Sequence, residues 1–324
     1  MEQRRVGRSG LSISSLGLGT MLWGRDLDLD AAAEVVVAFR DAGGTLIDTA
    51  GSYGGGMAER ILGQILGDVV PREEIVVATK AGLSPRGDQR IVDASRGALL
   101  GQLDASLRRL GVDWIDLWQL HAPDPSVPME ETLSALDYAV GAGKARYVGV
   151  SNYSGWRTGA TASWQLAAGR APIVSTQMEY SLLSRGVERE VIPACAELGI
   201  GLLPYAALGG GVLTGKYRQG IPADSRASIG DRFGERVRAR LDAHAMGIVE
   251  AIATAADGLA SSPLAVSLSW LLGRPAVAGA IVGARTVGQL TAMLAGAALE
   301  LPRAIADALD EVSAPSVSYP EAAG

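Results

Sequence analysis

Short β-rich runs alternate with helical patterns from one end of this chain to the other, and this alternation constrains the fold more than any other feature. Between the runs, apolar residues recur at helical spacing, and glycines such as Gly111 and Gly199 mark helix ends. The candidate strands are Leu16–Thr20, Thr45–Ala50, Ile75–Lys80, Trp114–His121, Arg146–Asn152, Ile173–Tyr180, Gly199–Ala206 and Gly279–Ala284. The candidate helices include Asp30–Asp41, Ala58–Leu66, Ser95–Leu110, Glu130–Val140 and Val187–Leu198.

Eight strand–helix units without a change in composition predict an α/β protein with one parallel sheet and crossover helices. A (β/α)8 TIM barrel is the natural closed form and suits a chain of 324 residues, and a doubly wound open sheet is the alternative. A short N-terminal β-hairpin, Arg4–Val6 with Leu11–Ser14, is expected before the barrel. We expect a single domain over residues 1–324, with the hairpin in 1–15, a long loop at 207–240 after the seventh strand and a C-terminal tail at 313–324.

Three of the first predicted strands end in an ionisable residue: Asp48, Lys80 and His121. Tyr53 follows Asp48 in the next loop. Because the active sites of such barrels lie at the C-terminal ends of the strands, we expect these four side chains to face one mouth of the barrel.

An acid, a phenol, an amine and an imidazole in one place form a proton-transfer apparatus. Free tyrosine and lysine have pKa values of about 10 and about 10.4, so neither is an effective acid at neutral pH. An ammonium group beside the phenol stabilises phenolate and makes the phenol a better proton donor, while an aspartate keeps the amine charged. The set therefore suits protonation of an oxygen as hydride adds to a carbonyl. It contains no nucleophile–base pair, which disfavours acyl transfer.

Composition excludes several other classes. The formal net charge of −6 argues against a nucleic-acid binder, and no apolar run approaches the length of about 20 residues that a membrane span needs. With two histidines and one cysteine, the chain is poor in the usual zinc ligands, so we expect no metal. The single cysteine and the polar N-terminus fit a cytoplasmic protein. The sequence carries no signal for an oligomeric state.

The four residues stand in segments that together resemble the aldo-keto reductase family over essentially the full chain. The matching segments are Leu16-Gly17-Leu18-Gly19-Thr20, Asp48-Thr49-Ala50 with Tyr53-Gly54, Thr79-Lys80, Leu120-His121, Gly149-Val150-Ser151-Asn152, Gln177 and Pro204-Tyr205. The resemblance implies a barrel that reduces aldehydes or ketones with NADPH. It also implies Tyr53 as the general acid, Asp48 and Lys80 as its tuning partners, and His121 as the residue that orients the carbonyl.

The resemblance extends to the cofactor. Ser151, Asn152 and Gln177 match the family's carboxamide-binding positions, and Tyr205 matches the residue that stacks on the nicotinamide ring. A ring held in this way presents one face to the substrate, which makes hydride transfer stereospecific. The glycine-rich run that begins with Leu208 and Gly210 lets backbone N–H groups approach the pyrophosphate. Arg285 and Gln289 match the adenosine-phosphate site.

Several positions depart from the family pattern. Ala292 and Met293 replace an acid and an asparagine, so we expect a weaker grip on the cofactor and a moderate preference for NADPH, with NADH possible. Ala122 replaces an aromatic residue after the histidine, which predicts a roomier substrate pocket. Trp23 in the first loop is the expected remaining wall.

The leading interpretation is a carbonyl reductase that acts on a small-molecule substrate. Two alternatives stay open on the same scaffold. One is a nucleotide-sugar or enoyl reductase. The other is a regulatory subunit that binds cofactor and turns it over slowly, like the channel-associated branch of the family.

Overall fold

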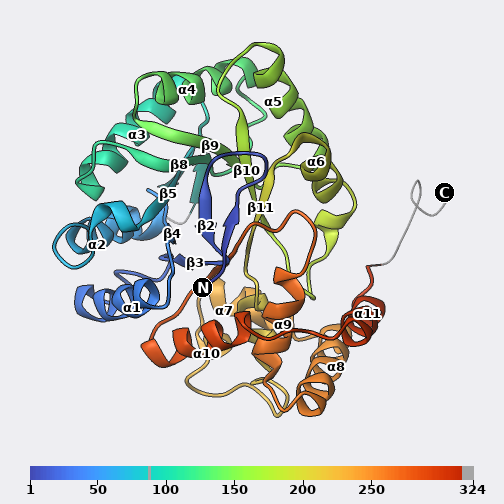
Figure 1. Cartoon of the computed structure of the whole chain (residues 1–324). Helices are drawn as coiled ribbons and strands as arrows, with labels where there is room; N and C mark the ends of the chain where they lie inside the picture. Colours follow the sequence, from blue (N-terminus) through green and yellow to red (C-terminus); the bar gives the residue numbers. More distant parts are fainter. Residues whose placement is uncertain (87–88, 316–324) are drawn as a thin grey trace.

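A sheet of eight parallel strands forms the centre of the computed structural model, which describes residues 1–86 and 89–315 (Figure 1). Its strands are β3 (Leu16–Gly19), β4 (Leu46–Asp48), β5 (Val76–Ala81), β8 (Ile115–Leu120), β9 (Ala145–Ser151), β10 (Ile173–Glu179), β11 (Gly201–Tyr205) and β12 (Ala280–Val282). Sheet neighbours follow chain order from β3 to β11, and β12 pairs with β3. Backbone bonds of Leu202 with Ala276 and Ala278 join β11 to the segment before β12. The predicted (β/α)8 TIM barrel is confirmed.

Helices surround the sheet (Figure 1). They are α1 (Leu29–Asp41), α2 (Met57–Ile65), α3 (Arg96–Leu110), α4 (Met129–Gly141), α5 (Gly155–Ala167), α6 (Val191–Leu198), α7 (Arg232–Arg238), α8 (Ala243–Gly258), α9 (Pro263–Leu272), α10 (Val287–Ala297) and α11 (Arg303–Val312). Asp28, Ser95 and Thr286 cap α1, α3 and α10 by accepting backbone N–H groups of the first turn. In the described part of the chain, no single helix combines the length and apolar composition of a membrane span, although bent α8 and α9 together meet that test.

The N-terminal hairpin closes the amino end of the barrel. Strands β1 (Gln3–Arg5) and β2 (Ser12–Ser14) pair in antiparallel fashion, which confirms the predicted hairpin. Its apolar residues Val6, Leu11 and Ile13 join the interior cluster of the barrel. Gly7 adopts a φ of +58°, and a Cβ there would lie 2.1 Å from the carbonyl oxygen of Gly199, so only glycine fits this close approach.

Two segments go beyond the predicted pattern. A second hairpin, β6 (Leu83–Arg86) with β7 (Gln89–Val92), follows β5. The stretch 207–240 contains short helical segments, η4 (Gly209–Thr214) and η5 (Arg226–Ser228), as well as α7. Remaining short 3-10 segments are η1 (Tyr53–Gly56), η2 (Arg72–Glu74) and η3 (Gly186–Glu188). Of the expected C-terminal tail, residues 316–324 lie outside the described residues.

The single cysteine, Cys195, is buried on α6. Burial raises the pKa of its thiol to about 12, so almost no thiolate exists at neutral pH. We expect iodoacetamide to leave the native protein unlabelled at pH near 8 and to modify one thiol per chain after unfolding in urea. Mass spectrometry measures both states. Rapid labelling of the native protein would show that the thiol is accessible.

Candidate active site

Strand periodicity carries the candidate residues to the carboxyl mouth of the barrel. Leu46 on β4, Ala78 on β5 and Leu203 on β11 fill the barrel interior. Side chains two positions apart point to the same face of a strand, so Asp48, Lys80 and Tyr205 stand one layer above them. They lie at or near the ends of β4, β5 and β11.

Asp48 and Lys80 form a buried ion pair. The Lys80 ammonium donates to Oδ1 and Oδ2 of Asp48 at 2.8 and 2.7 Å and to the carbonyl oxygen of Thr49 at 3.0 Å. Both side chains are nearly inaccessible, at 2% exposure each. Burial lowers the pKa of Lys80, but the negative charge of Asp48 and the interaction with Tyr53 outweigh it, and the pKa is raised overall. The amine is therefore a fixed positive charge at neutral pH.

Tyr53 and His121 adjoin this pair. The Lys80 nitrogen lies 5.3 Å from the centre of the Tyr53 ring. The rings of Tyr53 and His121 are 5.9 Å apart and nearly perpendicular. Nδ1 of His121 is 3.5 Å from Oγ of Ser52. The structure thus brings together the three residues predicted at strand ends and Tyr53 of the following loop.

A second ion pair, not predicted from the sequence, supports the loop that carries Tyr53. Glu59 on α2 is fully buried, accepts from Thr79 at 2.6 Å and pairs with Arg109 on α3 at 2.6 Å. A Cβ at Gly51 or Gly56 would lie 2.9 or 2.7 Å from atoms of the Arg109 side chain. Arg109 therefore packs directly against the backbone on both sides of Tyr53. Glu59 stands in the first turn of α2, and the helical pattern there gives no sign of the pairing.

The predicted nicotinamide residues form one hydrogen-bond network. Nδ2 of Asn152 donates to the carbonyl oxygen of His121 at 2.9 Å and to Oγ of Ser151 at 3.1 Å. The Tyr205 hydroxyl donates to Oδ1 of Asn152 at 2.8 Å. Asn152 has a φ of +60°, a conformation that asparagine tolerates better than most residues, so the network stabilises a turn that aims the amide. The Ser151 hydroxyl donates to the carbonyl oxygen of Gln177 at 2.9 Å.

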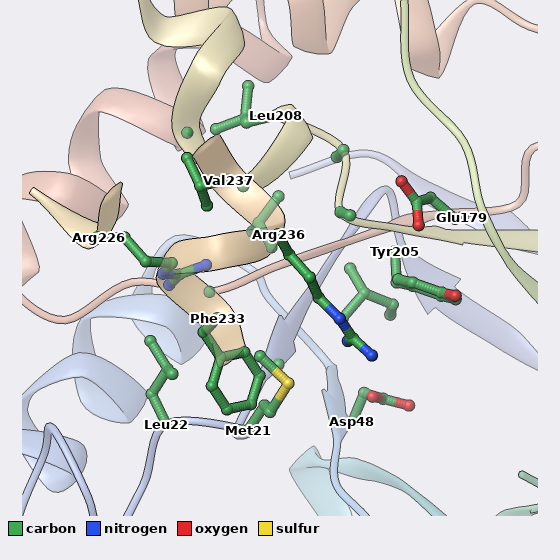
Figure 2. A pocket seen from close by; sticks show the side chains of 18 of the residues that line it. Met21, Leu22, Asp48, Glu179, Tyr205, Leu208, Arg226, Phe233, Arg236 and Val237 are labelled. Atoms are coloured by element: carbon green, nitrogen blue, oxygen red, sulfur yellow. The ribbon is translucent and has the colours of Figure 1, made fainter. Parts of the chain in front are cut away.

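These groups border a cavity of about 750 Å³ (Figure 2). Predicted residues in its wall are Asp48, Tyr53, His121, Ala122, Asn152, Gln177, Tyr205, Leu208, Gly210, Arg285, Gln289, Ala292 and Met293. Lys80 and Ser151 are buried behind this wall.

The expected role of Trp23 as a pocket wall is wrong. Its side chain is 1% exposed, belongs to the core between sheet and helices, and is absent from the cavity lining. The neighbouring residues Met21 and Leu22 line the cavity instead, together with Phe233 of α7 (Figure 2). The turn after β3 directs Trp23 inward, and a large apolar side chain gains more from burial there than from a wet cavity wall.

Helix α7 lies over the cavity, within the segment 207–240 that was expected to be a long loop. Asp231 caps it by accepting from the backbone nitrogens of Phe233 and Gly234. Arg25, from the loop after β3, lies over the Phe233 ring at 4.8 Å and pairs with Asp231 at 3.2 Å. Figure 2 shows Arg236 extending from α7 toward the end of the cavity where Tyr205 and Asp48 lie. The loop after β3 and the start of α7 are far apart in sequence, and they contact each other at the edge of the cavity.

Positive charge gathers at the other end of the cavity. Lys216, Arg226 and Arg285 line it, beside Gly210 and Gly211, which both have positive φ. Burial, followed by the positive charges of Arg285 and Arg25, lowers the pKa of Arg226. Asp26 offsets part of this positive charge, and the remaining cluster makes a receptor for an anion. Oε1 of Gln289 accepts from the backbone nitrogen of Arg285 at 2.9 Å and fixes the turn.

Comparison with known proteins agrees with this geometry. The family model described as "Aldo/keto reductase family" matches residues 15–314. "Aldo-keto reductase YhdN" of Bacillus subtilis (strain 168) is 33% identical over 300 residues, covering 90% of this chain and 88% of that protein. "L-glyceraldehyde 3-phosphate reductase" of Escherichia coli (strain K12) is 35% identical over 302 residues, covering 90% and 86%. "Probable voltage-gated potassium channel subunit beta" of Oryza sativa subsp. japonica is 35% identical over 297 residues, covering 90% and 89%.

Proposed function

Because this chain belongs to the aldo-keto reductase family of oxidoreductases, we propose that it reduces an aldehyde or ketone to an alcohol with NADPH, with Tyr53 as the general acid. The observation that carries this proposal is the buried Asp48–Lys80 pair, which sets a permanent positive charge 5.3 Å from the Tyr53 ring. A small-molecule carbonyl in the cavity would meet this phenol and the His121 imidazole together.

The chain's own residues perform the proton transfer. His121 donates a hydrogen bond to the carbonyl oxygen and orients it. As negative charge develops on that oxygen, the Tyr53 hydroxyl transfers its proton to it, and the Lys80 ammonium stabilises the phenolate that remains. Asp48 holds the ammonium in place through two short contacts. NADPH, when bound, supplies the hydride.

The shape and charge of the cavity fit NADPH. Tyr205 offers an aromatic face for the nicotinamide ring, next to the amides of Asn152 and Gln177. Gly210 and Gly211 have positive φ and no side chain, so a pyrophosphate can approach the backbone of η4 closely. Arg226 and Arg285 would hold the 2′-phosphate.

Two opposing features set the choice of cofactor. Arg226 and Arg285 favour NADPH, whereas Ala292 and Met293 offer no polar contact to adenine. We therefore expect a moderate preference for NADPH over NADH. Arg226→Gln should raise the dissociation constant of NADPH about tenfold and change that of NADH much less, because only NADPH carries the phosphate. Fluorescence titration with both cofactors measures the two constants, and equal losses would exclude a phosphate contact.

Oxidation of NADPH, followed by its absorbance in the presence of a panel of aldehydes and ketones, tests the proposed activity. We expect turnover with several small aldehydes. Tight cofactor binding without turnover on any carbonyl would overturn the proposal. It would favour the second candidate, a regulatory subunit, which is supported by the similarity to a protein named as a channel subunit.

A further inference from the structure

One hydrogen bond crosses the mouth of the barrel and connects the nicotinamide seat to the acid–base residues. Gln177 donates from Nε2 to Oδ1 of Asp48 at 2.8 Å, and both side chains are buried. The two residues are 129 positions apart, and β9, β8 and β5 lie between their strands in the sheet. Oδ1 of Asp48 thus accepts from Gln177 and from Lys80 at the same distance of 2.8 Å.

The chemistry of the partners determines how the Gln177 amide is oriented. A carboxylate paired with an ammonium accepts hydrogen bonds and donates none, so the amide atom facing Asp48 is the nitrogen. The amide oxygen remains for a donor in the cavity, which Gln177 lines. The main chain of Gln177 is also held, because its carbonyl oxygen accepts from the Ser151 hydroxyl and the Asn152 backbone nitrogen at 2.9 and 3.1 Å.

We propose that Gln177 is a positioning residue that couples occupation of the nicotinamide seat to the Asp48–Lys80 pair beside Tyr53, an inference that rests on the proposed carbonyl reduction. The carboxamide N–H of the cofactor donates to Oε1 of Gln177. This polarises the amide and strengthens the donation from Nε2 to Asp48, because hydrogen bonds in a chain reinforce one another. The acid is then strongest when the hydride donor is in place.

The effect on Tyr53 has a definite sign. A hydrogen bond from a neutral donor compensates part of the negative charge of Asp48. Without it, the field of that carboxylate disfavours phenolate more strongly, and the pKa of Tyr53 rises. The other ionisable groups that face this region are Lys80 from β5, His121 after β8, Glu179 from β10, Tyr205 from β11, Arg236 from α7 and Arg240 after α7. The substitutions tested here leave all of them in place.

Kinetics at saturating NADPH test the coupling with Gln177→Met, which keeps the length and removes both amide groups. We expect the dissociation constant of NADPH to rise about tenfold. We also expect the alkaline limb of the kcat–pH profile for carbonyl reduction to move up by at least about half a pH unit. Gln177→Glu should move this limb at least as far, because the substitution adds a negative charge.

The matched control is Asn152→Gly, which removes a carboxamide contact and keeps the positive φ. It should weaken NADPH binding and leave the limb in place.

Titration of the cofactor-free protein provides a readout that does not need turnover. The ultraviolet absorbance of phenolate, corrected with the Tyr53→Phe protein, reports the ionisation of Tyr53. This transition should lie at higher pH in Gln177→Met than in the wild type and in Asn152→Gly. The proposed coupling is overturned if the Tyr53 transition in Gln177→Met lies at the wild-type pH. It is also overturned if the transition shifts equally in Gln177→Met and Asn152→Gly. If no form of the protein reduces any carbonyl, the proposed function fails, and this titration still decides the role of Gln177.

Discussion

Tyr53→Phe is expected to lower the turnover number for carbonyl reduction by at least about 100-fold, because it removes the only hydroxyl proposed to protonate the developing alkoxide. The ring, its edge contact with His121 and its position near Lys80 all remain available to phenylalanine. NADPH affinity should therefore stay nearly unchanged. Stopped-flow absorbance of NADPH at saturating substrate measures the chemical step, and fluorescence titration measures the affinity.

Tyr205→Phe is the matched control, since it deletes the same atom at the opposite side of the site. The Tyr205 hydroxyl donates to Asn152 at 2.8 Å and has no proposed part in proton transfer. We expect this control to weaken NADPH binding a few-fold and to retain most of the turnover number. Wild-type turnover in Tyr53→Phe would show that another group is the acid.

Glu59→Ala should produce the largest loss of stability among the substitutions considered. It leaves the Arg109 guanidinium and the Thr79 hydroxyl without their acceptor in a buried site. Breaking a buried ion pair from one side costs about 3 kcal/mol or more in the free energy of unfolding. Urea unfolding followed by circular dichroism measures this loss. Turnover should fall as well, because Arg109 packs against the loop that carries Tyr53.

Three further variants distinguish the loss of the Glu59–Arg109 ion pair from the unspecific effect of a substitution. Glu73→Ala, an exposed site on η2, should be nearly neutral. Glu59→Gln should cost less than Glu59→Ala, because the amide can still accept from Thr79. The double variant Glu59→Leu with Arg109→Met should lose less unfolding free energy than its two single variants lose in sum. In the double variant neither charge is left unpaired. A loss in Glu59→Ala no greater than that in Glu73→Ala would show that the pair contributes nothing.

Periodicity and strand ends were sufficient to predict most of the fold and the position of the four acid–base residues. Side chains alternate along a strand, so a residue two positions beyond a core residue must also face inward. Asp48 stands in this relation to Leu46, and Lys80 to Ala78. The β6–β7 hairpin was missed because it is a local excursion from the strand–helix alternation.

Contacts between distant segments could not be predicted in this way. Trp23 shows the difficulty, because a tryptophan in a first loop suits a pocket wall as well as a core, and only the path of the turn places it in the core. The segment 207–240 contains several arginines, and its sequence does not show that α7 would lie over the cavity. Such contacts depend on loop paths, which local propensity does not determine.

The sequence alone therefore determined the strand–helix alternation and the strand ends at which the reactive groups stand, because both follow from residue periodicity and from chain order. Only the tertiary structure decided that Glu59 and Arg109 support the Tyr53 loop and that Gln177 donates to Asp48. The physical reason is that a hydrogen bond requires its two atoms to lie within about 3 Å of each other. The register of the strands and the closure of the sheet set that separation for residues that the sequence holds far apart.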